Sequence, residues 1–128
     1  MKTGTQWLIS ASLVALLGAA GCVHATFVQT GTRYPARVAG CQVEVFSSTL
    51  PHRPYEELGI VEGEGDWWKS DLEDVLPKLK EEACRAGGDA LILIDSDTFA
   101  EGDQGIRVQR VTATVIRWKR GAPDSARR

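Results

Sequence analysis

Apolar and polar positions alternate along the segment 41–47. Val43 and Val45 fall on one face of this segment, opposite mostly polar side chains. A period of two residues is typical of a strand, so the segment predicts the first strand of the fold. The prolines of the TLPHRPY segment that follows lack a backbone donor and fix turn dihedral angles, which predicts a change of direction there. A second strand is expected over 56–64.

A helical pattern follows the second strand. Ser70 and Glu73 have the spacing of a capping box, so the helix should begin near Ser70. One stripe of an otherwise polar helix should be buried, because apolar residues recur there at three- and four-residue spacing: Leu72, Val75, Leu76, Leu79 and Ala83. Pro77 should kink the helix, since it deletes a backbone hydrogen bond. Gly87 and Gly88 should end it.

Two more strands are expected after the helix. The apolar run of DALILID, at 89–95, predicts a central strand covered on both faces. The last strand, over 106–119, changes phase along its length, and a bulge near Gln109 and Arg110 would reconcile its two halves. The expected fold is therefore α+β with the order β-β-α-β-β. It is a two-layer sandwich in which one helix packs on one face of a mainly antiparallel sheet.

The first 22 residues have the layout of a secretory signal. Lys2 is the only charged residue before position 33, and the stretch 7–20 is almost wholly apolar. This stretch is shorter than the roughly 20 residues that a spanning helix needs, which favours a cleaved signal over a permanent anchor. The residues Ala19-Ala20-Gly21-Cys22 resemble a bacterial lipobox, whose cysteine becomes the lipidated first residue of the mature protein. Plain secretion, with Cys22 as an ordinary residue, is the alternative.

The lipobox resemblance implies a membrane anchor on Cys22, because several acyl chains hold a protein on a bilayer where a single chain binds reversibly. Val23 differs from the Asp typical of inner-membrane retention, so the periplasm-facing side of the outer membrane is the expected location in a cell with two membranes. Phe27 and Val28 could still dock as an edge strand. The expected organisation is a signal peptide at 1–21, the lipidated cysteine and a flexible tether at 22–39, a globular α+β domain at 40–119 and a disordered tail at 120–128.

Without residues 1–21, the chain carries fourteen basic and seventeen acidic side chains and has a net charge of −3. Its 107 remaining residues suit one small domain. The weakly acidic balance argues against nucleic acid as a partner, because nucleic-acid binding needs a basic face. No cofactor is expected.

Two cysteines, Cys41 and Cys84, remain in the expected domain. In an oxidising compartment such a pair usually forms a disulfide, and two buried free thiols are the alternative. Closing a loop of this length should stabilise the domain by about 4 kcal/mol. The domain contains no CxxC motif, so thiol catalysis is not expected.

The run CRAGGDALILI, at 84–94, resembles the helix end of small RcsF-like and YbjQ-like envelope lipoprotein domains. In that group Ala-x-x-Gly-Ala-(Asn or Asp)-Ala precedes an apolar strand. The segment 53–66 resembles the part of the same domains that precedes the helix. The resemblance implies an α+β fold and a place in the cell envelope. This domain has two cysteines where RcsF-type proteins have four.

Candidate catalytic chemistry is sparse. His24 lies in the expected tether and His52 between two prolines, and neither is placed beside a nucleophile, so no catalytic residue is expected. Four acidic residues fall in one expected hairpin loop: Asp95, Asp97, Glu101 and Asp103. Their spacing fails the EF-hand rule, which favours a solvated loop over a weak divalent-cation site.

Trp67 and Trp68 are adjacent, and two adjacent rings cannot both face one core. Either one is buried and the other flanks the sheet, or an exposed ring marks a contact surface for a partner. The patterns together favour a membrane-anchored lipoprotein acting as a non-catalytic binding or envelope-sensing module, with another envelope protein or a glycan as partner. A small metal-dependent hydrolase that uses the acidic loop and a purely structural envelope component are the alternatives.

Overall fold

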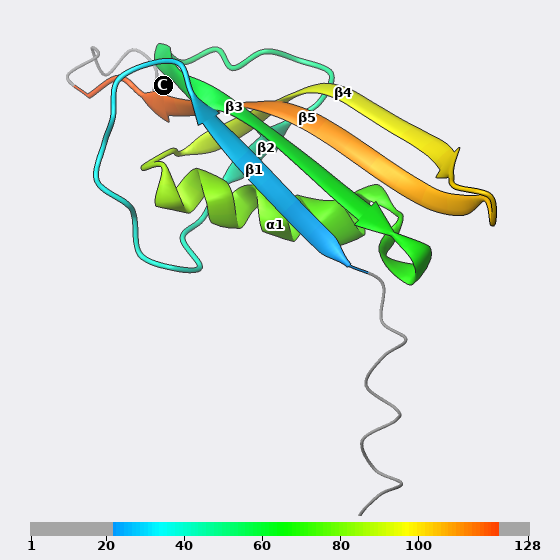
Figure 1. Ribbon diagram of the computed structural model, residues 1–128. Coiled ribbons are helices and arrows are strands. Elements are labelled where there is room, and N and C mark those ends of the chain that lie inside the picture. Colours follow the sequence, from blue (N-terminus) through cyan, green and yellow to red (C-terminus); the bar gives the residue numbers. More distant parts are fainter. Residues whose placement is uncertain (1–21, 121–128) are drawn as a thin grey trace, which may run out of the picture.

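The computed structural model describes residues 22–120, which form five strands, one α-helix and one short 3-10 helix (Figure 1). The signal peptide expected at 1–21 lies outside the described residues, as do residues 121–128 of the expected tail. None of the described helices is long and apolar enough to cross a membrane. In chain order the elements are β1 (Val23–Gln29), β2 (Glu44–Phe46), β3 (Tyr55–Asp66), η1 (Trp67–Lys69), α1 (Leu72–Arg85), β4 (Ala90–Glu101) and β5 (Ile106–Trp118).

The strands form one sheet in the order β1-β3-β5-β4-β2, and α1 packs on one of its faces (Figure 1). Neighbouring strands are antiparallel except for β2 and β4, which are parallel. The predicted α+β class, with one helix on one face of a sheet, is confirmed. The predicted order of elements is wrong, because β1 adds a third strand before the helix.

Strand β1 occupies part of the segment 22–39, for which sequence analysis predicts a flexible tether. It pairs antiparallel with β3 along all of its seven residues. Val23, Ala25 and Phe27 are half-buried on one face, and Ala25 and Phe27 pack against the core. The tether prediction fails for these residues because every second side chain has an apolar surface to cover, which is the pattern of an edge strand with one buried face.

The N-cap of helix α1 lies one residue later than predicted. Asp71 is the N-cap, and its backbone N–H donates to the carboxylate of Asp74 (3.2 Å). These two residues repeat the three-residue spacing of Ser70 and Glu73, so the predicted capping box is displaced by one position. Pro77 lies inside the helix, as expected.

The core lies between α1 and the sheet face that it covers. The predicted apolar stripe of the helix supplies Val75, Leu79 and Ala83, which are fully buried. Opposite this stripe β3 presents Gly63, where an added Cβ atom would lie 2.7 Å from Cδ2 of Leu79 and 2.8 Å from Cγ1 of Val75. The missing side chain at Gly63 therefore allows the helix to pack close to the sheet.

Strand β4 differs from its prediction. It lies between β5 and the edge strand β2 rather than at the centre of the sheet. Only Ala90 and Leu91 of its apolar run are fully buried, because the single helix covers one face and ends near this point. The bulge expected at 109–110 of β5 is also wrong, since that part of β5 pairs without interruption. The register shifts lie in the two neighbouring strands, between Glu57 and Gly59 of β3 and between Leu93 and Asp95 of β4.

Candidate functional site

Trp67 and Trp68 form an exposed aromatic pair in η1, between β3 and α1. Trp67 is 49% exposed and Trp68 is 70% exposed, and the two rings stack with their centroids 6.0 Å apart. Trp67 has a φ angle of +54°, which is uncommon for a bulky residue. The expectation of one buried ring is therefore wrong. A role of the exposed rings in partner contact stays a prediction.

The turn that carries the pair is fixed from two sides. The buried Ser70 hydroxyl donates to the carbonyl of Trp67 (2.8 Å). On the strand side, an added Cβ atom on Gly65 would lie 2.0 Å from the carbonyl oxygen of Lys69, so only glycine allows the turn to fold back this closely. The surrounding backbone thus holds both rings outside the core.

Cys22 lies directly before β1 and is joined to Asp66, the residue that precedes the aromatic pair. Its backbone N–H donates to Oδ1 of Asp66 (2.7 Å), and the Asp66 N–H donates to the Cys22 carbonyl (3.1 Å). The Cys22 thiol is free and exposed. Because Asp66 directly precedes Trp67, Cys22 and the aromatic pair lie at the same end of the sheet, where β1 begins and β3 ends (Figure 1).

Sequence analysis missed the role of Asp66. The hydrogen bonds join residues that are 44 positions apart, and no local pattern reports such a contact. The signal that could have revealed this contact is the alternation of apolar and polar residues in VHATF, at 23–27. Such an alternation predicts a strand that begins immediately after Cys22.

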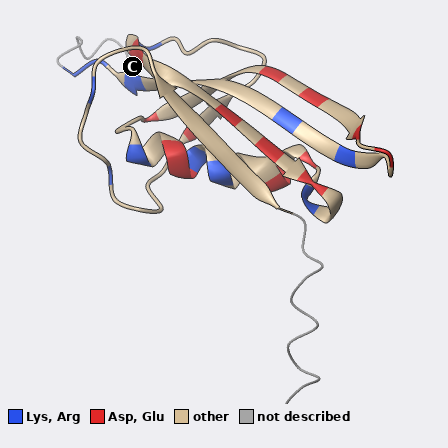
Figure 2. Cartoon of the chain, viewed as in Figure 1, with Lys and Arg blue, Asp and Glu red and all other residues tan. Residues whose placement is uncertain are grey.

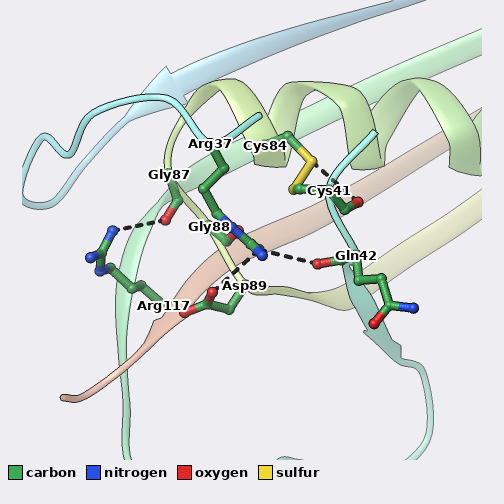
Figure 3. Close-up of a disulfide and its surroundings, with 8 residues drawn as sticks. All are labelled: Arg37, Cys41, Gln42, Cys84, Gly87, Gly88, Asp89 and Arg117. Carbon is green, nitrogen blue, oxygen red and sulfur yellow. Dashed lines mark hydrogen bonds and ion pairs between the residues drawn. A yellow bond between two sulfur atoms is a disulfide. The ribbon is translucent and has the colours of Figure 1, made fainter. Parts of the chain in front are cut away.

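The other end of the helix carries the Cys41–Cys84 disulfide, whose Cα atoms are 6.0 Å apart (Figure 3). This confirms the predicted pairing. Cys84 lies in the last turns of α1 and is buried, whereas Cys41 lies in the loop between β1 and β2. The disulfide therefore fastens this loop across the C-terminal end of the helix.

Arg37 reinforces the same loop (Figure 3). Its guanidinium donates to the carbonyls of Gln42 (3.1 Å) and Gly88 (2.9 Å) and forms an ion pair with Asp89 (3.3 Å). Its backbone N–H also donates to the carbonyl of Cys84 in the last turn of α1 (2.8 Å), where carbonyl groups lack partners within the helix. Arg37 thus has a structural role that sequence analysis did not predict.

Two surface depressions border this loop. One, of about 490 Å³, lies between the loop and the last turns of α1, and Arg37, Pro77 and Arg85 are among its lining residues. The other, of about 260 Å³, has Phe27, Tyr34 and Arg85 among its lining residues. Arg85 therefore lies between the two depressions at the end of the domain away from Cys22.

Tyr34 in the smaller depression has a perturbed hydroxyl group. It donates to the carboxylate of Glu56, and the guanidinium of Arg117 lies 4.0 Å from the centroid of its ring. The hydrogen bond to Glu56, together with burial and the negative charge of that carboxylate, raises the pKa of Tyr34 above its ordinary value of 10.0. Tyr34 is therefore a neutral donor at physiological pH.

Charged residues lie along the strands β3, β4 and β5 (Figure 2). Nε of Arg110 donates to Glu64 (2.7 Å), and this bond raises the pKa of Arg110 further above its ordinary value. Nε2 of His24 lies 3.6 Å from the other oxygen of Glu64, so His24 belongs to a strand and not to a tether. His52 is exposed in a bend. Exposed ion pairs of this kind stabilise a fold little, which indicates a solvated face.

The four acidic residues expected in one hairpin loop are spread along the strand. Asp95, Asp97 and Glu101 belong to β4, and Asp103 lies in the turn after it. Within residues 22–120, no group of three or more His, Cys, Asp or Glu side chains could hold a metal ion. The cation-site alternative therefore has no support from this geometry.

No protein-family model and no curated protein matches the chain. Among solved structures, the chain is similar to the crystal structure of a Francisella virulence factor, FvfA, with a TM-score of 0.51 and 15% sequence identity. The similarity covers 73% of this chain and 98% of that chain. At this level of identity it shows the fold alone, and it agrees with the α+β architecture.

Proposed function

We propose that this chain is a bacterial envelope lipoprotein, anchored by acyl chains on Cys22, whose domain is a non-catalytic binding or envelope-sensing module. The observation that carries the proposal is the place of Cys22. It follows the lipobox-like Ala19-Ala20-Gly21 run, and its exposed thiol stands one residue before the first strand. A modifying enzyme could reach this sulfur without unfolding the domain.

Two further features support export to the envelope. The Cys41–Cys84 disulfide suits an oxidising compartment, because such bonds are rare in cytosolic proteins. Val23 leaves the chain without the Asp that is typical of inner-membrane retention, so we assign the lipoprotein to the periplasm-facing side of the outer membrane. This location agrees with the RcsF-like and YbjQ-like resemblance of the helix end.

The end of the domain opposite Cys22 is the best candidate for the partner contact. Both surface depressions open there, on either side of Arg85, and the disulfide and Arg37 hold the loop between them in one conformation. A rigid concave surface costs less conformational entropy on binding than a mobile one. We therefore assign this end to binding another envelope protein.

Crosslinking in living cells, followed by pull-down of the tagged chain, tests the binding role. The wild type should recover an envelope protein, and the Arg85→Glu variant should lose it. Cys22→Ala, which cannot be acylated, should lose it too because the domain is no longer held at the membrane. Lys119→Glu is the matched charge control, since Lys119 is exposed and lines neither depression.

Equal recovery with all four chains would contradict the binding role of this surface. Recovery of a glycan without a protein would contradict the choice of partner.

A further inference from the structure

We propose that Trp67 and Trp68 seat the domain directly on the bilayer that holds the acyl chains of Cys22, with both rings in the interfacial region of the lipid. This inference rests on the proposed function, because it requires the lipid anchor. It goes further because it assigns the surface that contacts the membrane and the orientation of the domain. The aromatic pair contacts lipid, and no protein partner contacts these rings.

The first step of the argument is the short path from the anchor to the rings. Cys22 and Asp66 are joined by two backbone-involving hydrogen bonds of 2.7 and 3.1 Å. Trp67 follows Asp66, and consecutive Cα atoms are about 3.8 Å apart. No flexible spacer separates Cys22 from the sheet, because β1 begins at Val23. Acyl chains on Cys22 would therefore bring this end of the domain to the lipid surface.

Acylation leaves the hydrogen bond to Asp66 intact. N-acylation turns the terminal amine of a mature lipoprotein into an amide, which keeps one N–H to donate to the Asp66 carboxylate. The thioether forms at Sγ, which is exposed and lies outside this hydrogen bond. The geometry at the start of β1 is therefore compatible with a modified cysteine.

The second step is the chemistry of the two rings. Both are exposed large apolar side chains, and they are stacked on each other. Tryptophan is enriched at membrane–water interfaces, because its ring is apolar and its indole N–H can still bond to water or headgroups. The positive φ of Trp67 and the close turn at Gly65 keep this pair outside the core.

The third step is the charge around the rings. Lys69 is exposed next to the pair and can approach lipid phosphate. Of the neighbouring carboxylates, Asp66 accepts the Cys22 N–H and Asp71 pairs with Arg107 (3.0 Å). In the first turn of α1, Asp74 accepts the Asp71 N–H (3.2 Å), and Glu73 is exposed. Strand β1, which reaches the same end, carries no Lys, Arg, Asp or Glu (Figure 2). The contact is therefore mainly aromatic, and added salt should weaken it little.

The orientation follows from these contacts. The aromatic pair lies at the N-terminal end of α1, and the disulfide and both depressions lie at the C-terminal end. With the rings in the lipid interface, the proposed partner surface faces away from the membrane. A rigidly seated domain thus presents this surface at a fixed height above the rings, which over the 14 residues of α1 is about 21 Å.

Tryptophan fluorescence in bilayers tests the proposal directly. The lipidated protein is purified from membranes and reconstituted in vesicles of phosphatidylethanolamine and phosphatidylglycerol, with and without bromine on the upper part of the acyl chains. Of the Trp residues that remain after removal of 1–21, Trp118 lies at the other end of β5 and packs edge-on against Phe46. Brominated lipid should quench most of the Trp67 and Trp68 emission and leave that of Trp118.

Two variants separate the contributions. Trp118→Phe should keep the quenching, and a Trp67→Ser/Trp68→Ser double variant should lose it. The quenching measured in the wild type and in Trp118→Phe tests the proposal even if the double variant does not fold. Quenching should persist in high salt.

Unquenched Trp67 and Trp68 emission in protein whose intact mass shows acyl chains on Cys22 would overturn the inference and leave the anchor standing. A chain without acyl mass would overturn the anchor and this inference together. Protection of the rings from acrylamide in native membranes without quenching by brominated lipid would assign the pair to a protein partner, and would also overturn the inference.

Discussion

Removing the Cys41–Cys84 disulfide should destabilise the domain strongly. The bond joins residues that are 43 positions apart, so it closes a loop that contains the whole of β2, β3 and nearly all of α1. In the chain-entropy treatment a loop of this size stabilises the folded state by about 4 kcal/mol, because it restricts the unfolded chain. Small domains have a total stability of roughly 5–15 kcal/mol, so this one bond supplies a large share.

The assay is thermal and urea unfolding followed by circular dichroism, on the chain from residue 22 onward with Cys22→Ser to prevent thiol exchange. The Cys41→Ala/Cys84→Ala variant should melt roughly 15–30 °C lower than its parent, since 1 kcal/mol corresponds to about 4–8 °C in a domain of this size. The parent in excess reductant should match the variant, and it controls for the lost side-chain volume.

A loss of less than about 1 kcal/mol in both arms would refute the reasoning. It would mean that Arg37 and the packing of the loop fix this end of the domain without the covalent bond. A large loss in the variant but not in reductant would point to the cavity left at the buried Cys84 rather than to the cross-link.

Three further predictions follow from individual contacts. Gly63→Ala should cost about 1–3 kcal/mol in urea unfolding, because its Cβ atom would lie 2.7 Å from Leu79, whereas Glu62→Ala on the exposed face should change little. Tyr34 should ionise above pH 10.0 in an ultraviolet titration, and the Glu56→Gln variant should lower the pKa of Tyr34. The hydrogen bond between Tyr34 and Glu56 should stabilise the fold below pH 10, and this stabilisation should be lost as the pH rises through the pKa of Tyr34 in the folded state. An unchanged titration in Glu56→Gln would contradict this. Millimolar calcium, zinc or magnesium should leave the melting temperature unchanged, because the acidic residues of the β4–β5 hairpin are separated along the strand; a clear rise would restore the cation-site hypothesis.

Sequence patterns predicted the helix and its disulfide well, for local reasons. The stripe of Val75, Leu79 and Ala83 has a helical period that only one buried face can explain, and the structure buries all three. The prediction of the cysteine pair needed only two thiols in a domain that is expected to be exported. The helix prediction depends on spacings of a few residues, and the disulfide prediction depends only on the number of cysteines.

Long-range arrangement could not be predicted in the same way. The apolar run of β4 suggested a strand covered on both faces, but the pattern does not report which strands flank it, and β4 lies next to the edge. Strand β1 follows a signal-like stretch, and the mixed composition of the segment 22–39 predicts a tether, whereas the structure shows half-buried and exposed residues alternating along β1. The contact of Cys22 with Asp66 depends on the pairing of β1 with β3, so it became visible only in three dimensions.

The central claim is that lipid on Cys22 fixes where this protein works, and intact-mass analysis of the native product from membranes tests it most directly. The account predicts a chain that begins at Cys22, carries the added mass of acyl chains, and gains two hydrogen atoms when reductant opens the Cys41–Cys84 disulfide. A product that begins at Met1, with an unmodified Cys22 and no association with membranes, would contradict it.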